Sequence, residues 1–127
     1  MILRPWTGRW GPRPGKYHAQ AVTVDGIRFD STREATRYRE LRLLVAAGEI
    51  TGLEQQPEFP LLVMERWRGG PPWIERYCGR YRADFRYVLP TGEIVIEDVK
   101  SAPTKTTAYR LRKRIVEAIH GVTIREV

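Results

Sequence analysis

Apolar and polar residues alternate from Gly79 to Val88, which is the pattern of a β-strand with two different faces. The sequence LPTG follows and is typical of a turn. Residues 93–100 are rich in Ile and Val and predict a second strand, so the two strands are expected to form a hairpin. One face of the first strand is expected to carry Tyr81, Ala83, Phe85 and Tyr87.

Two stretches of the chain carry helical signals. Ser31 is placed to start a helix that runs to about Ala47, and Gly48 is placed to end it. A second helix is expected over residues 105–120, with Gly121 as its stop signal. The apolar residues that share one face of this second helix are Leu111, Ile115, Ala118 and Ile119.

The remaining elements are shorter. They are a hairpin at 22–29 around Asp25-Gly26, a strand at 50–63 broken near Pro57 and Pro60, a loop or hairpin tip at 65–77, and a closing strand at 122–127. The order helix, strand, strand, strand, helix, strand predicts an α/β fold, a single domain with a mixed β-sheet flanked by helices. Residues 1–20, rich in Gly, Pro and basic residues, are expected to form an arm before a domain of residues 21–127.

Charge and cysteine content narrow the classes of partner and site. Lys and Arg number 22 against 15 Asp and Glu, which gives a net charge of +7 in 127 residues. The positive charge is clustered, which favours nucleic acid as a partner over a merely solubilising surface charge. Cys78 is the only cysteine, so an intramolecular disulfide and zinc sites with two or more cysteines are excluded. No signal peptide and no apolar run of transmembrane length is present, so a cytoplasmic location is expected.

The stretch GEIVIEDVKS, residues 92–101, reads as a buried strand that ends in charged residues. The hairpin is expected to set Asp84 opposite Asp98, to within about one residue. Because side chains alternate along a strand, Asp98 and Lys100 share a face and Glu97 points to the other one. Glu97 is therefore interpreted as a surface residue or as a support for a site formed by its neighbours.

Two carboxylates on facing strands need positive charge near them, because like charges across a sheet are unfavourable by up to about 1 kcal/mol. Lys100 is one source of that charge, and a divalent cation is another. Mg²⁺ is bound by one or two carboxylates with water and phosphate oxygens, which suits Asp84 and Asp98. The alternative is a solvated strand end, in which Asp84 pairs with Arg82 or Arg86.

A third carboxylate, Glu34, lies in the first turn of the first helix. Ser31 and Glu34 have the spacing of a capping box, which explains Glu34 without any function. Glu34 also begins a stripe at helical spacing that is expected to face the sheet, where a carboxylate is placed to help hold a metal ion. The stripe consists of Glu34, Tyr38, Leu41 and Val45. Arg37 and Glu40 lie off this stripe and are expected to be solvated.

The second helix and the N-terminal arm are strongly basic. Lys105 and Tyr109, four residues apart, are expected to share a face, where a phosphate contact and a lysine lying along a half-buried tyrosine fit equally well. The residues predicted to contact DNA are Lys105, Tyr109, Arg110, Arg112, Lys113, Arg4, Arg9, Arg13 and Lys16. A solvated helix face and an arm that crosses onto a second subunit remain the alternatives.

The candidate residues follow one another on specific elements of the chain. They are Glu34 on a helix, Asp84 on a strand, Asp98-Val99-Lys100 on the next strand, and Lys105 and Tyr109 on a helix. This order, over about residues 28–127, resembles the PD-(D/E)xK nuclease superfamily, which has the restriction-endonuclease-like fold. More narrowly, the segments KYHAQ, DGIRFDSTREATRYRELRLL, ADFRY, EDVKS and YRLRKRIVEAIHG look like a small phage-encoded family, similar within the superfamily to archaeal-type Holliday junction resolvases.

The resemblance implies a metal-dependent endonuclease that hydrolyses DNA phosphodiester bonds with Mg²⁺ or Mn²⁺. It implies that Asp84, Asp98 and Glu34 hold the metal, and that Lys100 orients or activates the attacking water or stabilises developing charge. It also implies a homodimer that cuts four-way junctions. The sequence departs from the signature at Ala83, where the superfamily's name has Pro, and at Asp98, where Glu is commoner, but neither change removes a ligand.

Two other functions stay open. One is a nuclease of the same fold that acts on branched, mismatched or transposon-end DNA, and the long segment between Glu34 and Asp84 bears on this choice. The other is a non-catalytic DNA-binding accessory protein. The intact set of Glu34, Asp84, Asp98 and Lys100 argues against the second, because a degenerate descendant is expected to have lost one of them.

Overall fold

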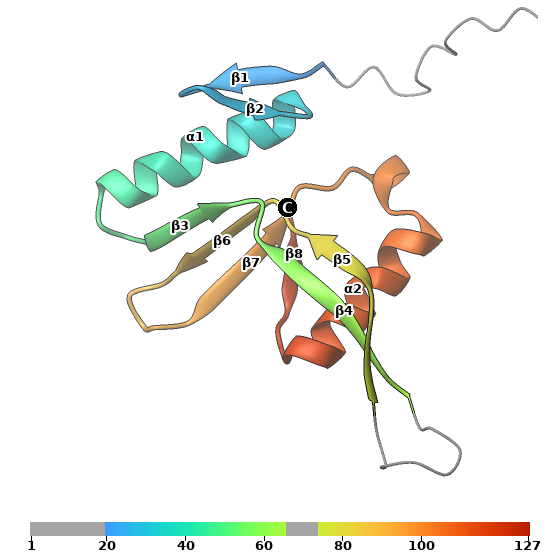
Figure 1. The fold of residues 1–127 in the computed structure, drawn as a ribbon. Helices are drawn as coiled ribbons and strands as arrows, with labels where there is room; N and C mark the ends of the chain where they lie inside the picture. The colour runs from blue at the N-terminus through green and yellow to red at the C-terminus, as the bar shows by residue number, and fades with distance from the viewer. Residues whose placement is uncertain (1–19, 66–73) are drawn as a thin grey trace, which may run out of the picture.

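The structure, a computed structural model, describes residues 20–65 and 74–127 (Figure 1). Its strands and helices in chain order are β1 (Val22–Val24), β2 (Ile27–Phe29), α1 (Thr32–Ala46), β3 (Thr51–Gln55), β4 (Glu58–Glu65), β5 (Ile74–Arg82), β6 (Phe85–Val88), β7 (Ile94–Asp98), the short 3₁₀ helix η1 (Ala102–Thr104), α2 (Thr107–His120) and β8 (Ile124–Glu126).

The first elements form where their local signals predict them. Asp25 and Gly26 have φ angles of 52° and 76°, the left-handed conformation that a two-residue hairpin turn needs, and they join β1 to β2. Ser31 caps α1 because its hydroxyl accepts the backbone N–H of Glu34. Gly48, with a φ angle of 74°, follows the end of this helix. The predicted hairpin and first helix are therefore confirmed.

The central sheet has four strands in the order β3-β6-β7-β8. Strands β3, β6 and β7 pair antiparallel, whereas β8 lies parallel to β7. Because α1 precedes β3 and α2 connects β7 to β8, the helices and the strands of this sheet follow the order helix, strand, strand, strand, helix, strand. The predicted α/β fold, a single domain with a mixed sheet and two helices, is confirmed.

The prediction of one strand over residues 79–88 is wrong. The chain forms two strands here, β5 and β6, and breaks at Ala83 and Asp84. β5 pairs with β4 as a separate two-stranded hairpin, which projects from the body of the molecule (Figure 1). Tyr81 and Phe85, expected on one face of a single strand, pack into different clusters. The apolar alternation continues through the break, so the sequence pattern does not reveal it.

The strand predicted over residues 50–63 was expected to break near Pro57 and near Pro60. The break at Pro57 is confirmed, and the prediction of a break at Pro60 is wrong. Strand β3 ends before Pro57 and β4 begins after it, whereas Pro60 lies inside β4 and pairs with Arg80. Proline is tolerated in β4 because a strand of a two-stranded hairpin has one free edge, where no N–H is needed. The tip of this hairpin, residues 66–73, lies outside the described residues.

Helix α2 begins two residues later than predicted. The chain first makes the single turn of η1, which contains Pro103, and Thr106 then caps α2 with its side chain. Lys105 therefore precedes the helix and is not part of it. Gly121 ends α2 with a φ angle of 62°, as predicted.

The two helices cover opposite faces of the central sheet. The buried cluster on the α1 side consists of Phe29, Ala35, Tyr38, Leu41, Ile50, Phe85, Tyr87 and Val95. The buried cluster on the α2 side consists of Tyr81, Ala83, Ile96, Val116 and Ile124. Val95 and Ile96 are neighbours on β7 but belong to different clusters, so consecutive residues of this strand face different helices.

The apolar face expected for α2 is not its buried face. Leu111 is 58% exposed and Ile119 is 37% exposed, while Val116 is fully buried. The side of the helix toward the sheet also includes Tyr109 and Lys113, which contact β8. These polar contacts and Val116 together set the rotation of the helix, which apolar spacing alone does not give.

Candidate active site at the end of strand β7

The hairpin register predicted for β6 and β7 is confirmed. Phe85 pairs with Glu97, and extending the register by one residue sets Asp84 opposite Asp98. Asp98 is 1% exposed and Glu97 is fully buried. The two neighbouring acids point to opposite faces of the sheet, Glu97 toward α1 and Asp98 toward α2, as the alternation predicts.

Asp98 is the last residue of β7, and its carboxylate is incompletely paired. Its oxygen Oδ2 is buried and has no hydrogen-bond partner among the described residues. Its oxygen Oδ1 lies 4.0 Å from Nζ of Lys100, at the outer limit of an ion pair. Burial raises the pKa of Asp98 above its ordinary value of 3.8, although the charge of Lys100, the Tyr109 hydroxyl and the backbone N–H of Asp84 oppose the shift. Such a carboxylate costs free energy that a purely structural residue would avoid.

Asp84 occupies the break between β5 and β6, where the chain passes the end of β7. Its Oδ2 accepts the N–H of Val99 at 2.7 Å, and its own N–H donates to the carbonyl oxygen of Glu97 at 3.0 Å. Burial raises the pKa of Asp84 above 3.8, although the Val99 N–H and the charges of Lys100 and Arg82 oppose the shift. The irregular backbone at the break thus brings a second partly buried carboxylate to the end of β7.

The alternative of a solvated strand end does not agree with these contacts. Asp98 is buried, and Arg86, one of the partners considered for Asp84, pairs with Glu54 at 3.2 Å. Arg82 makes no ion pair among the described residues, although its charge acts on Asp84. The basic group that shares an ion pair with either aspartate in the described part of the chain is Lys100.

Half of the predicted capping box forms at Glu34: its N–H donates to the Ser31 hydroxyl, but its carboxylate does not accept the N–H of Ser31. Its Oε2 accepts the N–H of Asp30 at 3.3 Å, and its Oε1 accepts the hydroxyl of Ser31 at 3.3 Å. Burial and the negative charge of Asp84 raise the pKa of Glu34 above 4.5. Glu34 therefore lies near enough to Asp84 for the two charges to interact. Its role as a metal ligand stays a prediction.

Carboxylate oxygens suitable for a metal ion are present, but fewer converge than predicted. Across residues 20–65 and 74–127, no three His, Cys, Asp or Glu side chains lie close enough together to hold a metal ion. Asp84 and Asp98 supply carboxylates at neighbouring strand ends, including the buried Oδ2 of Asp98 that lacks a partner. Mg²⁺ takes one or two carboxylates and keeps several waters, so the chemistry of this pair fits that ion.

Glu97 is fully paired, and the interpretation of Glu97 as a surface residue is wrong. Arg37 of α1 donates from Nε to Oε2 at 2.9 Å and from Nη2 to Oε1 at 2.8 Å. The hydroxyl of Tyr87 donates to Oε1 at 2.6 Å. Although burial acts to raise the pKa of Glu97, the bonds from Arg37 and Tyr87 hold it below 4.5. Burial and the bond to Glu97 raise the pKa of Tyr87 to about 12.

Arg37 was expected to be solvated, and that expectation is also wrong. Its side chain is 25% exposed and joins α1 to β7 directly beside Asp98. Strand alternation signalled that Glu97 turns away from Asp98, but it did not identify the partner. Arg37 and Glu97 are 60 positions apart, so no local spacing connects them.

Three residues predicted to contact DNA converge instead on Glu126 of β8. Nζ of Lys105 lies 2.7 Å from Oε2 of Glu126, and Nζ of Lys113 lies 3.2 Å from Oε1. The hydroxyl of Tyr109 donates to the same Oε1 at 3.3 Å. Lys105 and Lys113 lower the pKa of Glu126 to about 2. Sequence reasoning missed Glu126, which belongs to no recognised motif, and its single negative charge offsets part of the positive charge of the two lysines.

A pocket of about 550 Å³ opens on the α2 side of Asp98. β5, the end of β7 and the first turns of α2 form its walls. Its lining residues are Arg80, Tyr81, Arg82, Asp98, Lys100, Thr106, Ala108, Tyr109 and Arg112. The pocket is thus lined by the carboxylate residue Asp98, by Lys100 and by three arginines. This combination of charges is suited to binding a phosphate group and a cation.

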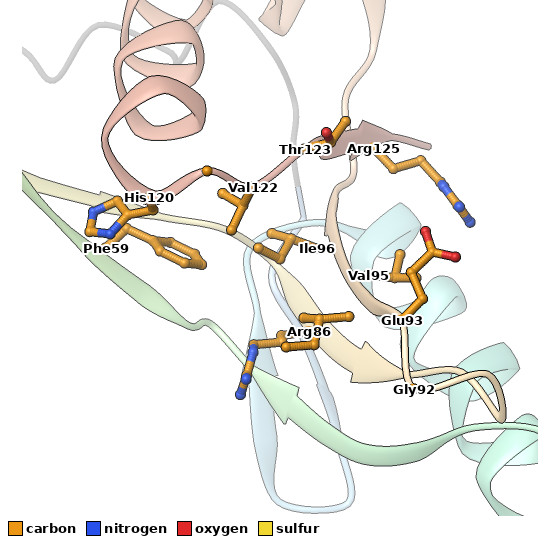
Figure 2. Close-up of a pocket in the computed structure, with 12 residues that line it drawn as sticks. Phe59, Arg86, Gly92, Glu93, Val95, Ile96, His120, Val122, Thr123 and Arg125 are labelled. Atoms are coloured by element: carbon orange, nitrogen blue, oxygen red, sulfur yellow. The ribbon is translucent and has the colours of Figure 1, made fainter.

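A larger pocket of about 660 Å³ includes the other end of β7 and neither aspartate. Figure 2 shows Phe59 and His120 beside each other at this pocket, with Ile96 and Val122 nearby. Nε2 of His120 lies 2.8 Å from the carbonyl oxygen of Pro60, and the Phe59 and His120 rings are 5.5 Å apart between centroids. His120, the last residue of α2, thus contacts Phe59 and Pro60 of β4. The pocket at Asp98 is the better candidate for a reaction site.

Comparison with known proteins identifies the family of the chain. A family model described as "Protein of unknown function (DUF1064)" matches residues 14–123. The chain belongs to this family. Searches of the curated proteins and of the solved structures returned no match. Glu34, Asp84, Asp98 and Lys100 all lie within the matched residues, so the candidate site is part of the DUF1064 domain itself.

The other predicted contacts fall into two groups. Arg110 and Arg112 are exposed on α2, whereas Arg4, Arg9, Arg13 and Lys16 of the arm lie outside the described residues. Within the part of the chain that the structure describes, no helix is long and apolar enough to cross a membrane.

Proposed function

We propose that this DUF1064 protein is a metal-dependent DNA endonuclease that hydrolyses phosphodiester bonds with Mg²⁺ or Mn²⁺. The observation that carries the proposal is that Asp98, whose Oδ2 is buried and unpaired among the described residues, lines a pocket together with Lys100 and three arginines. A buried carboxylate with a purely structural role is normally paired, as Glu97 is in this protein. A carboxylate left unpaired in a basic pocket is typical of a site that binds a ligand.

Asp84 and Asp98 are the residues that would hold the metal ion, with Glu34 near Asp84. When bound, the ion would lower the pKa of a water ligand and neutralise charge on the phosphate. The raised pKa values of both aspartates support this assignment, because a cation would offset the cost of burying their ionised forms.

Lys100 is placed to act on the substrate from the same pocket. Its Nζ lies 4.0 Å from Oδ1 of Asp98 and 4.8 Å from the centroid of the Tyr109 ring. These two contacts hold the ammonium group beside Asp98. From there it orients the attacking water and stabilises the negative charge that develops on the phosphate.

A four-way DNA junction is the proposed substrate, and a cytoplasmic homodimer is the proposed active form. The net charge of +7 and the basic pocket support a DNA substrate. The resemblance to archaeal-type Holliday junction resolvases supports the junction. A junction presents two symmetry-related strands, which a homodimer with two active sites would match.

The decisive experiment compares a labelled four-way junction with a linear duplex of the same arm sequence, in Mg²⁺ and in chelator. We expect paired, symmetric nicks in the junction, in Mg²⁺ only. Equal cleavage of the linear duplex would overturn the junction as substrate. Binding of DNA without cleavage in Mg²⁺ or Mn²⁺ would overturn the nuclease and favour a non-catalytic DNA-binding protein.

Single substitutions test whether the site is the one described. Asp84→Asn, Asp98→Asn and Lys100→Ala are each expected to abolish cleavage while junction binding in chelator is retained. Glu49→Gln, which removes an exposed carboxylate after α1, is the matched control and is expected to cut normally. Normal cleavage by Asp98→Asn would show that the reaction site lies elsewhere.

A further inference from the structure

We propose that β5 and the first turns of α2 form the surface that contacts the DNA backbone, and that Arg82 and Arg112 make its principal phosphate contacts. The inference rests on the proposed function in taking DNA as the polyanion and Asp98 as the place where one phosphate binds. It places the β4–β5 hairpin on the substrate side of the molecule.

Arg82 and Arg112 come from two different elements that wall one pocket. Arg82 is the last residue of β5, and Arg112 lies in the second turn of α2. Both line the pocket of about 550 Å³ that also contains Asp98 and Lys100. A strand of DNA with one phosphate at Asp98 would therefore pass both guanidinium groups.

These two arginines lack an ion-pair partner among the described residues, in contrast to Arg80 on the hairpin, although the charge of Arg82 acts on Asp84. Among the described residues, neither Arg82 nor Arg112 has a hydrogen-bond or ion-pair partner for its side chain, and both are exposed. Arg80, on the same strand, pairs with Glu58 at 3.1 Å. A free guanidinium group presents a planar fork of donors that matches phosphate oxygens, so these two are available for the backbone.

Two lysines, one just before α2 and one in it, are already paired with carboxylates. Lys105 binds Glu126, and Lys113 lies 3.2 Å from Glu126 and 4.0 Å from Glu117. A phosphate group would have to compete with these carboxylates for either lysine. The electrostatic attraction of this surface is therefore concentrated at the two arginines, of which Arg112 was predicted from the sequence, and less at the predicted Lys105 and Lys113.

The start of α2 adds a backbone donor to the same wall, since no partner is found among the described residues for the N–H of Ala108, whereas the Thr106 side chain accepts that of Tyr109. Thr106, which caps the helix, and Ala108 both line the pocket. The first N–H groups of a helix have no partner within the helix and favour phosphate oxygens. The pocket wall therefore combines side-chain and backbone groups that recognise phosphate without reading the base sequence.

The test measures junction binding by the full-length protein in chelator, with fluorescence anisotropy over a series of salt concentrations. Arg82→Ala and Arg112→Ala are each expected to reduce the slope of log affinity against log salt by about 0.9, the value for one lost phosphate contact. The double variant is expected to reduce the slope by about 1.8. Arg28→Ala on β2 and Arg39→Ala on α1, also exposed and without an ion pair among the described residues, are the matched controls.

Two further variants separate charge from structural damage. Arg82→Lys and Arg112→Lys keep the positive charge and are expected to retain most of the salt slope. Lys105→Ala is expected to change the slope much less than Arg112→Ala, because Glu126 already neutralises Lys105. Circular dichroism of each variant checks that the fold is retained.

The inference is overturned if Arg82→Ala and Arg112→Ala change the salt slope no more than the two controls do. That failure is distinct from failure of the proposed function. A protein that cuts junctions but shows unchanged slopes would be a nuclease with another DNA surface. A protein whose slopes fall as expected but which never cuts would have this DNA surface without the nuclease activity.

Discussion

Glu97 and Asp98 are consecutive buried acids on one strand, and their environments are opposite. Glu97 faces α1 and accepts two hydrogen bonds from Arg37 and one from Tyr87. Asp98 faces α2, has Lys100 at 4.0 Å and leaves one oxygen unpaired. Hydrogen bonds lower the pKa of Glu97, whereas burial raises the pKa of Asp98.

The difference distinguishes a carboxylate that stabilises the fold from one that is available to a ligand. Satisfied buried networks fix neighbouring elements to one another, and here the network fixes α1 to β7. Unsatisfied buried charges are rare in folded proteins and gather at functional sites. Glu97 therefore holds the strand end in place, and Asp98 supplies the candidate chemistry beside it.

The largest expected difference between the two acids is in catalysis. Asp98→Asn is expected to reduce junction cleavage by at least about 100-fold, because the variant loses a ligand for the metal that stabilises the reacting phosphate. Glu97→Gln, assayed at a temperature where it stays folded, is expected to keep much more activity. Initial rates of cleavage in Mg²⁺ measure both. Equal loss in the two variants would remove the functional distinction.

The next largest effect is on stability, where the Glu97 substitution is expected to be more damaging than the Asp98 substitution. Glu97→Gln is expected to lower the free energy of unfolding by about 3 kcal/mol, because Arg37 keeps its charge and loses its carboxylate. Urea denaturation measures this change. Glu40→Gln removes the exposed carboxylate that also pairs with Arg37, and it is expected to cost no more than about 1 kcal/mol. Similar costs for both variants would contradict the assigned role of Glu97.

Tyr87→Phe tests the third bond to Glu97. Loss of the hydroxyl, which donates to Oε1 at 2.6 Å, is expected to lower the free energy of unfolding by about 1.5 kcal/mol. Tyr77→Phe, at an exposed tyrosine of β5, is the matched control and is expected to change stability little. A neutral Tyr87→Phe substitution would show that Arg37 alone satisfies Glu97.

Asp98→Asn is expected to raise the free energy of unfolding in chelator by about 1 kcal/mol, since it removes a buried charge whose pairing is incomplete. Thermal unfolding in chelator measures this effect. A destabilised Asp98→Asn protein would indicate that the carboxylate is satisfied in the folded protein without a metal ion.

The smallest expected effect is the pH dependence of the unfolding free energies of the Asp98 and Glu97 variants relative to the wild type. Because the folded-state pKa of Asp98 is raised, its ionised form destabilises the protein, and this cost disappears as the pH falls through that raised pKa toward 3.8. The folded-state pKa of Glu97 is lowered, so its contribution is present above 4.5 and is lost as the pH falls below that value. Unfolding free energies measured against pH should therefore show the difference between Asp98→Asn and the wild type shrinking as the pH falls toward 3.8, and that of Glu97→Gln shrinking as the pH falls below 4.5. A difference that grows as the pH falls would contradict the pKa directions.

Features that depend on residues close together in the sequence were predictable from the sequence. The hydroxyl of Ser31 caps α1, Asp25 and Gly26 form the hairpin turn, and Gly121 ends α2. The register that sets Asp84 opposite Asp98 was also predictable, because a short turn determines how its two strands pair.

The break at Ala83 and Asp84 was not predictable, because the apolar alternation on both sides of it is continuous. Its effect on the site is direct. The break moves β5 out of the central sheet and frees Asp84 to bind the N–H of Val99. It also brings Arg82, at the end of β5, to the pocket of Asp98.

By itself the sequence determined that Glu97 and Asp98 point to opposite faces, because alternation is a property of the strand backbone. Only the tertiary structure decided what each of them meets there. Arg37, 60 positions from Glu97, reaches that carboxylate because α1 packs on its face of the sheet. On the other face, Lys100 lies 4.0 Å from Oδ1 of Asp98, and Oδ2 has no partner among the described residues. Burial and pairing depend on which elements pack together, and that is decided only when the whole chain has folded.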